Sequence, residues 1–455
     1  MDPSTSPLLT DLYQLNMVQA YLDTGMAETA VFEFFSRRLP KERRFLMAAG
    51  LEQALAFLEH VRFGSEEIDW LAASGRFNQR FLDYVASFRF SGDVDAMPEG
   101  TIFFADEPIL RVTAPIAEAQ LVETRLINLL HLQSLIAAKA ARMVLAAKGR
   151  ALIDFGLRRA HGAEAGLHAA RAAYVAGFAG TASVLAGPAF GVPLAGTMAH
   201  SFVQAHADES EAFLAFARSR PKDLVLLIDT YDTEAGAERV VRLAPRLSAE
   251  GITLRGVRLD SGDLAGHARR VRAILDEGGL QSVRIFASGG IDEREIARFV
   301  AEGAPIDGFG IGTSLVTSQD APALDCAYKL QAYAGRPRRK RSESKATWPG
   351  AKQVFRRYDG AGRMAGDVVS VEADRQPGER LLIRVMRNGR RVAEAPPLAE
   401  IRAHAAAELA RLPAELCSLE DVEPGETPYP VEIAPALRRL AEIADGRLEE
   451  DAAAP

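Results

Sequence analysis

Glycine pairs in the middle of the sequence are placed to bind phosphate. Gly289 and Gly290 follow one short apolar segment, and Gly312 and Thr313 follow the next. Glycine lets the backbone approach a ligand closely, and it exposes N–H groups where a helix begins, which favours phosphate. Tight turns without a ligand would use glycine in the same way. Because two such turns end adjacent segments, we favour a phosphate site.

Arginines follow two other apolar segments of the same kind. Arg158 and Arg159 come directly after the segment at 151–155, and Arg258 lies within the segment at 254–259. The guanidinium group binds a carboxylate or phosphate through two parallel hydrogen bonds. Ion pairs with the chain's own acidic residues are the alternative. The arginines therefore favour an anionic ligand without identifying it.

Four aspartates lie at the ends of two further segments, namely Asp229, Asp232, Asp260 and Asp263. Beside phosphate-binding glycines, carboxylates hold Mg²⁺ or the hydroxyl groups of a ribose. Helix N-capping is the competing explanation, and it accounts well for one or two of them. It accounts poorly for all four.

His200 lies in the sequence GTMAHS at 196–201, which follows a short apolar run at 192–195. We expect that run to be a strand, so that His200 lies at a strand end. An imidazole there can act as a nucleophile or a general base, although a purely structural histidine is equally compatible. Taken together, these residue types indicate phosphoribosyl or nucleotide chemistry.

Parallel strands are the elements that must position these residues. The last four of the five apolar segments begin about 25–30 residues apart, the size of a strand–helix unit. Their unbroken apolar character suits strands that are covered on both faces. The carboxyl ends of parallel strands meet at one edge, where barrels and doubly wound sheets bind substrates. The spacing fits either architecture, and the predicted strands lie at 151–155, 224–229, 254–259, 283–287 and 308–311.

The flanking regions mix helices with strands. Asn388 and Gly389 lie between the apolar runs 381–386 and 391–393 and predict a hairpin with a two-residue turn. Thr10 is the expected N-cap of the first helix. The other predicted strands lie at 30–35 and, as a pair, within 100–112; the predicted helices lie at 10–21, 51–61, 66–73, 115–147, 399–412 and 435–443.

Composition excludes several classes of protein. The 455 residues are 48% hydrophobic and 25% charged, with a net charge of -7, which is ordinary for a globular protein and gives no support for nucleic-acid binding. Cys326 and Cys417 form no CxxC pair, so a structural zinc or iron–sulfur site is not expected. The polar residues 1–7 do not resemble a signal peptide, and the uncharged stretch 172–207 is too rich in glycine and alanine to span a membrane. We therefore expect a cytoplasmic protein.

The sequence resembles the nicotinate phosphoribosyltransferase family in motifs that run in order over about residues 8–360. These motifs are LLTDLYQL at 8–15, FEFFSRR at 32–38, EAQLVET at 118–124, KAARMV at 139–144, FGLRRA at 155–160, GTMAHS at 196–201, RLDSGD at 258–263, GIGT at 310–313 and PGAKQV at 349–354. The resemblance implies the α/β fold of type II phosphoribosyltransferases, an irregular barrel with a second α+β domain. Residues 1–115 would form that second domain, 116–335 the barrel, and 336–455 a segment that packs partly with residues 1–115. It also implies a homodimer with shared active sites.

The family's reaction joins nicotinate to 5-phosphoribosyl 1-diphosphate (PRPP), with ATP hydrolysis coupled through a phosphorylated histidine and with Mg²⁺ present. The resemblance implies that His200 is the phosphorylated histidine, and that Arg258 holds the nicotinate carboxylate. It implies that Tyr13 stacks on the pyridine ring from the partner subunit. The remaining implied roles are substrate contacts for Arg158, Thr197 and Ser201, ribose or Mg²⁺ binding for Asp260 and Asp229, and 5-phosphate binding for Gly289, Gly290, Gly312 and Thr313.

Four alternatives stay open. A nicotinamide enzyme would use a similar site, but an acidic residue would face the amide, and the sequence around His200 is more similar to the nicotinate enzymes. A quinolinate enzyme would need neither ATP nor the phosphorylated histidine. Residues 224–233 resemble a type I phosphoribosyltransferase loop, but no glycine-rich turn follows them. A non-catalytic nucleotide-binding barrel would have lost residues that this chain retains.

Overall fold

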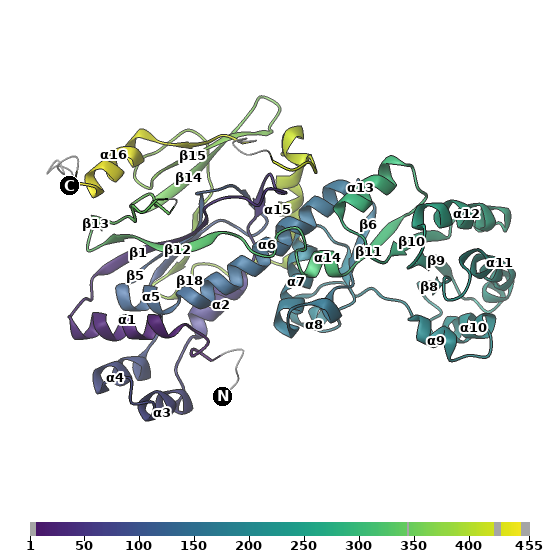
Figure 1. The fold of residues 1–455 in the computed structure, drawn as a ribbon, viewed down its shortest axis with the longest axis horizontal. Helices are drawn as coiled ribbons and strands as arrows, with labels where there is room; N and C mark the ends of the chain where they lie inside the picture. Colours follow the sequence, from purple (N-terminus) through teal and green to yellow (C-terminus); the bar gives the residue numbers. More distant parts are fainter. Residues whose placement is uncertain (1–5, 344, 423–428, 447–455) are drawn as a thin grey trace. The chain divides into compact units, whose positions relative to one another are not determined.

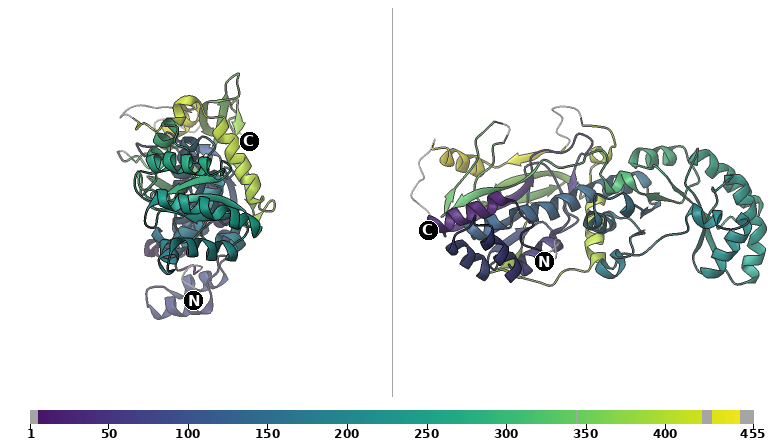
Figure 2. Two further views of the ribbon diagram at one scale, coloured as in Figure 1. Left: turned by 90° about the vertical axis from the view of Figure 1, so that its right-hand side faces the viewer. Right: turned by 60° about the horizontal axis from the view of Figure 1, so that its bottom comes forward.

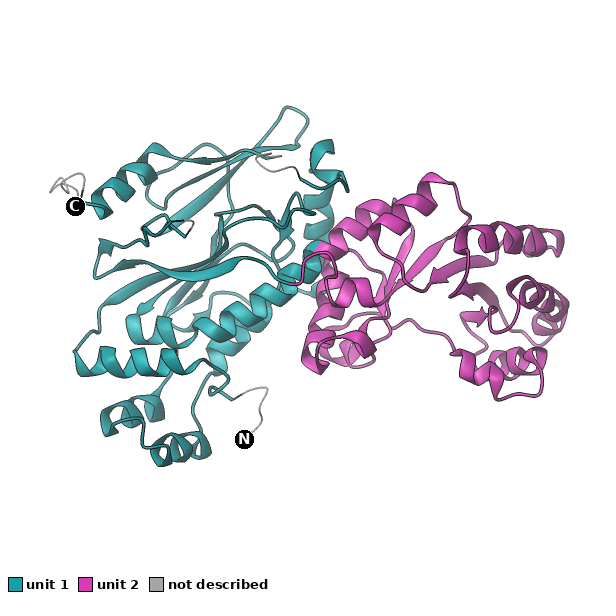
Figure 3. Cartoon of the chain, viewed as in Figure 1, with its two compact units in different colours: residues 1–138, 323–455 teal, residues 139–322 magenta. Residues whose placement is uncertain are grey.

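The computed structural model describes residues 6–343, 345–422 and 429–446, so most of the N-terminal stretch 1–7 lies outside the described residues. The chain divides into two compact units, shown in Figure 3. Unit 1 comprises residues 1–138 and 323–455, and unit 2 comprises residues 139–322. The sequence placed the boundaries at 115/116 and 335/336 instead. The difference arises because the long helix α6 (Glu123–Ala147) contributes to both units, and because β12 (Cys326–Tyr333) pairs with an N-terminal strand.

Unit 2 is built on a curled sheet of six parallel strands, in the order β7-β6-β11-β10-β9-β8. All five predicted strands are present and pair in parallel, with ends that differ by up to two residues from the prediction. Most of their residues are buried, and the half-buried Ile153, Val225 and Phe286 line a pocket. The bounds are β6 (Ala151–Asp154), β7 (Gly180–Thr181), β8 (Leu224–Leu227), β9 (Leu254–Leu259), β10 (Arg284–Ser288) and β11 (Gly308–Ile311).

Helices connect the strands of unit 2, as parallel pairing requires. The helices that follow β8 and β9 lie side by side and pack against β9, as Figures 1 and 2 show. The helical elements are η1 (Leu157–Arg159), α7 (Ala163–Ala176), α8 (Ala186–Phe190), α9 (His200–Gln204), α10 (Glu209–Ser219), α11 (Thr233–Ala249), α12 (Leu264–Glu277), α13 (Glu293–Ala301) and α14 (Thr313–Val316).

The prediction of a strand at 192–195 is wrong. Only one isolated bridge forms there, between Leu194 and Thr181, and the strand beside β6 is the two-residue β7. Pro193 explains why pairing does not extend, because its nitrogen carries no hydrogen to donate to a ladder. His200 therefore follows an irregular segment rather than a strand.

Unit 1 contains a sheet whose strands come from both the N-terminal and the C-terminal parts of the sequence, in the order β13-β12-β1-β5-β3-β17-β18. The strand β1 (Thr29–Ser36) pairs on one side with β12 and on the other with β5 (Pro108–Pro115), and β17 (Ile383–Arg387) pairs with β3 (Asp93–Ala96). Every pairing within this sheet is antiparallel. The expected packing of the C-terminal segment with the N-terminal segment is thus present.

Two smaller sheets and several helices complete unit 1 (Figure 1). One sheet has the order β16-β14-β15-β19, and the other pairs β2 with β4. The strand bounds are β2 (Leu46–Met47), β4 (Ile102–Phe103), β13 (Arg336–Pro337), β14 (Lys352–Tyr358), β15 (Met364–Val371), β16 (Glu379–Arg380), β18 (Arg390–Arg391) and β19 (Val431–Ile433). The helices are α1 (Leu12–Asp23), α2 (Leu51–His60), α3 (Ser65–Ala73), α4 (Gln79–Ser87), α5 (Ile116–Leu121), α15 (Leu398–Ala410), η2 (Ala414–Cys417) and α16 (Pro435–Ala444).

Local turn chemistry decides two details of unit 1. The predicted hairpin is confirmed, with Asn388 and Gly389 at φ 49° and 72° between β17 and β18, the positive values that a type I′ turn needs. The predicted N-cap is wrong. Asp11, not Thr10, precedes α1, and the Thr10 hydroxyl instead donates to the Gln14 side chain.

The helix α6 is the one helix among the described residues that is long and apolar enough to cross a membrane. Of its most apolar stretch, 78% is buried inside the protein. A core helix of this kind meets the same length and composition criteria. The uncharged stretch 172–207 is divided among helices, turns and a short strand.

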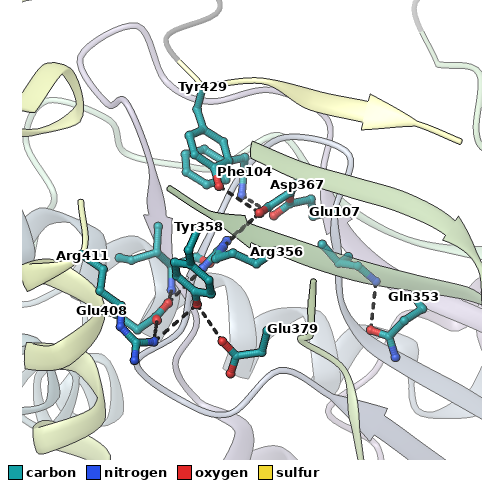
Figure 4. A network of polar contacts seen from close by, with 12 residues as sticks. Phe104, Glu107, Gln353, Arg356, Tyr358, Asp367, Glu379, Glu408, Arg411 and Tyr429 are labelled. Carbon is teal, nitrogen blue, oxygen red and sulfur yellow. Dashed lines mark hydrogen bonds and ion pairs between the residues drawn. The ribbon is translucent and has the colours of Figure 1, made fainter. Parts of the chain in front are cut away.

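A buried polar network stabilises unit 1 (Figure 4). Arg356 on β14 is fully buried and forms hydrogen bonds with both oxygens of Asp367 and with Glu408. Tyr429 donates to Asp367 at 2.9 Å and stacks on Phe104. The network therefore joins strands β14 and β15 to α15 and to the segment before β19.

Candidate active site

A pocket of about 1500 Å³ lies in unit 2, and five of the twelve predicted site residues line it. Its lining includes residues from the ends of β6, β9 and β11 and from the segment that leads into α9. Pockets for small molecules usually occupy ~300–1,000 Å³, so this one has room for more than a single small ligand. The predicted residues among its walls are Arg158, Thr197, His200, Arg258 and Asp260.

His200 and Asp229 form a hydrogen-bonded pair at this site. Nε2 of His200 lies 3.1 Å from Oδ1 of Asp229, whose side chain is 1% exposed, whereas the imidazole is 37% exposed. A carboxylate can only accept, so the hydrogen lies on Nε2. Nδ1 then keeps its lone pair and is the nitrogen that can act as a nucleophile.

Asp229 also holds the loop that follows β9. Its second oxygen, Oδ2, accepts from the backbone N–H of Asp260 at 2.9 Å and from the Ser261 hydroxyl at 2.6 Å. One buried carboxylate thus connects the imidazole of His200 to the RLDSGD motif. The sequence predicted a ribose or metal role for Asp229, and the geometry adds a role in orienting His200 and this loop.

Arg258 points from β9 toward the pocket and is only partly satisfied. Nη2 donates to the Met198 carbonyl at 2.9 Å, and Nη1 lies 3.7 Å from Oδ1 of Asp260. Its Nε atom is buried and has no hydrogen-bond partner among the described residues. Burial lowers the pKa of the guanidinium, despite the opposing attraction of Asp260 and Asp229. An anionic ligand would supply the negative charge that this guanidinium needs beside it.

Phe155, Ser288 and Met198 also surround Arg258, and none of the three was predicted as a site residue. The guanidinium lies over the Phe155 ring at 5.7 Å, a cation–π geometry. The Ser288 hydroxyl donates to Asp260 at 2.5 Å and accepts a longer hydrogen bond, of 3.4 Å, from Arg258. The third residue is Met198, whose carbonyl accepts from Arg258. Phe155 and Met198 belong to quoted motifs, and Ser288 directly precedes the glycine pair, so their neighbours in the sequence were the available signal.

Asp154, just before Phe155, is buried at the end of β6. It accepts from Thr181 at 2.6 Å and from the Gly156 backbone at 2.7 Å. Burial raises the pKa of this carboxyl, and the two hydrogen bonds oppose that rise. Asp154 therefore fixes the turn that leads from β6 to Arg158.

The two glycine turns lie at the ends of β10 and β11, as predicted. Gly289 has φ 99°, and a Cβ placed there would lie 2.2 Å from the Asp260 carbonyl oxygen, so only glycine fits this turn. Asp292 caps α13 by accepting from the N–H groups of Arg294 and Glu295. Gly312, before α14, provides no side-chain cap. The helix after the second glycine turn thus begins without the side-chain cap that the helix after the first turn has.

The four aspartates separate into two kinds. Asp232 accepts from the backbone of Ala235 at 2.8 Å and Asp263 from that of Gly266 at 3.1 Å, so both are helix N-caps. Asp260 lines the pocket, whereas Asp229 is 1% exposed and uses both oxygens to contact His200, Asp260 and Ser261. Mg²⁺ usually takes one or two carboxylates together with substrate phosphates and water, and Asp260 fits that pattern better than Asp229 does. Among the described residues there is no group of three or more possible metal ligands.

The other predicted residues lie as follows. Arg158 is exposed on η1, close enough to Arg258 to lower the pKa of that guanidinium further. Thr197 and Ser201 flank His200, and Ser201 is exposed on α9. Tyr13 lies on α1 in unit 1 and is 47% exposed, so its stacking role stays a prediction.

Comparisons with known proteins agree along nearly the whole chain. Residues 8–131 match the model of the nicotinate phosphoribosyltransferase N-terminal domain, residues 150–335 that of the nicotinate phosphoribosyltransferase family, and residues 378–441 that of the C-terminal domain. Together these ranges cover far more than half of the sequence.

Similar proteins come from bacteria and animals. The chain is 50% identical to nicotinate phosphoribosyltransferase pncB2 of Mycobacterium tuberculosis over 438 residues, covering 96% of this chain and 93% of that protein. It is 41% identical to the Bacillus subtilis nicotinate phosphoribosyltransferase over 357 residues, 77% of this chain and 72% of the relative. The crystal structure of human nicotinic acid phosphoribosyltransferase superimposes with a TM-score of 0.85 at 30% identity, covering 96% of this chain and 100% of that one. The chain belongs to the nicotinate phosphoribosyltransferase family.

Proposed function

We propose that this enzyme transfers the 5-phosphoribosyl group of PRPP to the ring nitrogen of nicotinate, releasing pyrophosphate, and that ATP hydrolysis drives the reaction through His200. In the transfer the bond from C1 of the ribose to pyrophosphate breaks and a bond to the pyridine nitrogen forms. No protein nucleophile takes part in that exchange. The protein needs to position both substrates, neutralise the leaving group and exclude water.

The observation that carries the proposal is the incomplete hydrogen bonding of Arg258. Its side chain is 14% exposed at the pocket wall over Phe155. Its Nε has no hydrogen-bond partner within the part of the chain that the structure describes, and burial lowers the pKa of the guanidinium. A planar carboxylate such as that of nicotinate matches the donors of a guanidinium and restores the missing charge. An uncharged amide would do so less well, which favours nicotinate over nicotinamide as the acceptor.

His200 supports the proposal of ATP coupling. With the hydrogen held on Nε2 by Asp229, Nδ1 is free to attack the γ-phosphorus of ATP, and ADP leaves. Water later breaks the phosphorus–nitrogen bond and releases phosphate. The 37% exposure of the imidazole leaves room for a phosphoryl group.

Mg²⁺ and a second copy of the chain complete the proposal. Mg²⁺ would neutralise the pyrophosphate as it leaves, and Asp260, which lines the pocket and is positioned by Asp229, is the residue that would hold it. Gly289, Gly290, Gly312 and Thr313 would bind the 5-phosphate through their backbones. Tyr13 would reach the pyridine ring from the partner subunit of a homodimer, as the family resemblance implies.

Pyrophosphate release is the direct test. PRPP and Mg²⁺ would be supplied with nicotinate, nicotinamide or quinolinate, each with and without ATP. We expect release with nicotinate and a rise in its rate on adding ATP. Release with nicotinamide or quinolinate alone would keep the fold and overturn the proposed acceptor. Release with none of the three would contradict the reaction itself.

His200→Ala separates coupling from transfer. We expect this variant to lose the ATP-dependent rise and ATP hydrolysis, while a slow ATP-independent transfer persists because Arg258 and the glycine turns are intact. A variant at the exposed His161, outside the site, is the matched control. A normal response of His200→Ala to ATP would show that the histidine is not phosphorylated during turnover.

A further inference from the structure

Lys139 is a buried cation of unit 2 that the proposed mechanism does not use. It lies on α6, in the KAARMV motif, and is 2% exposed. Its ammonium nitrogen lies 2.9 Å and 2.7 Å from the two carboxylate oxygens of Glu293 and 2.8 Å from Oδ1 of Asp320. It is not among the residues that line the pocket.

The two carboxylates that Lys139 binds follow the two glycine turns. Glu293 is the first residue of α13 and comes four residues after Gly289. Asp320 comes just after α14 and seven residues after Thr313. One ammonium group therefore connects the segments that continue from both turns.

A second contact joins the same two segments directly. The Ser314 hydroxyl, buried at the start of α14, donates to the Ile291 carbonyl at 2.6 Å. Ile291 is the residue after Gly290. The segments after β10 and β11 are thus linked twice. A hydrogen bond joins them close to the glycines, and an ion cluster joins them farther along the chain.

A second cation contacts this cluster. Arg142, one helical turn after Lys139, places Nε 3.3 Å from Glu293, so two cations face the two carboxylates. Buried ions tolerate little displacement, because each one loses the partners that compensate for its removal from water. Such a cluster holds the segments it joins at a fixed separation.

We propose that Lys139 is a positioning residue that sets the spacing of the two glycine turns, and through them the affinity for the 5-phosphate of PRPP. This inference rests on the proposed function. Backbone N–H groups bind a phosphate strongly only when they are held in place to within about 0.5 Å. Lys139 acts from behind the turns, through Glu293 and Asp320, without contacting the ligand.

Lys139→Met tests the proposal, because methionine has a similar length and no charge. We expect the KM for PRPP to rise about tenfold, equal to 1.4 kcal/mol, while the KM for nicotinate changes less than about twofold. Calorimetric titration of the protein with PRPP and Mg²⁺ should show the same loss of affinity. This second readout does not depend on which acceptor the enzyme uses.

Lys352→Met is the matched control for the loss of a buried ammonium. Lys352 on β14 in unit 1 is 3% exposed and pairs with the buried Glu33. We expect this variant to lose thermal stability as Lys139→Met does, with an unchanged affinity for PRPP. The double variant Lys139→Met with Glu293→Gln removes one charge of each sign from the cluster and does not restore the connection. It should regain stability and keep the weakened PRPP binding.

Three results would overturn the positioning role. They are an unchanged PRPP affinity in Lys139→Met, recovery of that affinity in the double variant, or an equal loss in Lys352→Met. None of them bears on whether the wild-type enzyme joins nicotinate to PRPP. Conversely, a wild-type enzyme that binds PRPP but does not use nicotinate would overturn the proposed acceptor and leave the role of Lys139 open to the same titration.

Discussion

Each unit of the chain buries an arginine among carboxylates, and the two arginines differ in how fully the protein satisfies them. In unit 1, Arg356 has a side-chain exposure of 0% and donates to Asp367, Glu408 and the Ile102 carbonyl (Figure 4). In unit 2, Arg258 makes one short hydrogen bond, to Met198, and its Nε finds no partner among residues 6–343, 345–422 and 429–446. The first arrangement is closed, and the second is open toward a pocket.

The pKa values of the two guanidinium groups shift in opposite directions. Burial lowers both, but Asp367 and the neighbouring carboxylates raise the pKa of Arg356 overall. At Arg258 burial prevails over Asp260 and Asp229. The comparison teaches that burial alone does not distinguish a structural charge from a binding charge. The distinction lies in whether the protein supplies the whole counter-charge or leaves part of it to a ligand.

The largest expected effect is the loss of Arg356. Arg356→Met should destabilise unit 1 by about 3–5 kcal/mol, because Asp367 and Glu408 would stay buried without their cation. The measurement is urea unfolding of the purified variant. Activity of the fraction that remains folded should show unchanged KM values. A small loss of stability would contradict the view of this network as a closed structural unit.

A smaller effect is expected at Asp229. An amide cannot accept on both sides, so Asp229→Asn must lose either the contact with His200 or the contacts with Asp260 and Ser261. The loss of a charged hydrogen bond costs ~1.5–3 kcal/mol, so the ATP-dependent rate should fall about 10- to 100-fold. Ser261→Ala, which removes one hydroxyl, should reduce it less than about tenfold. Equal losses in both variants would show that Asp229 does not orient the histidine.

The smallest effect concerns Glu107, a fully buried acid beside Asp367 (Figure 4). Burial, and next the charge of Asp367, raises the pKa of Glu107 well above its usual value. The folded protein therefore retains a proton that the unfolded chain has lost above about pH 4.3, and stability falls as pH rises beyond that point. Glu107→Gln mimics the protonated acid, so the variant should gain ~1.4 kcal/mol relative to wild type between pH 5 and pH 6. Parallel urea titrations at the two pH values would reveal it, and identical pH dependence in both proteins would show that Glu107 does not retain this proton.

Much of unit 2 could be predicted because its signals are local. Each of the five predicted parallel strands is a run of four to six mostly apolar residues, and chain order alone places its polar end at one edge. The Gly289–Gly290 turn and the Asn388–Gly389 turn could be predicted equally well, since positive φ values select a few residue types. The family motifs then identified His200 and Arg258 and suggested their roles.

The rest depends on contacts between residues distant in the chain. No local pattern distinguishes Asp229, which meets His200 and Ser261, from Asp232, which caps the next helix. The prediction of a strand at 192–195 is wrong because Pro193 cannot donate a backbone hydrogen bond, although the run is apolar. The division into units escaped prediction because β12 pairs with β1 across almost 300 residues of sequence, as their register shows.

Acceptor selectivity tests the central claim most directly, namely that Arg258 is left unsatisfied in order to bind a carboxylate. The measurement compares kcat/KM for nicotinate with that for nicotinamide, at saturating PRPP and ATP, in the wild-type enzyme and in Arg258→Met. We predict that the wild type favours nicotinate at least about 100-fold, and that the variant loses most of this preference through a higher KM for nicotinate. A variant that kept the full preference for nicotinate would contradict the account.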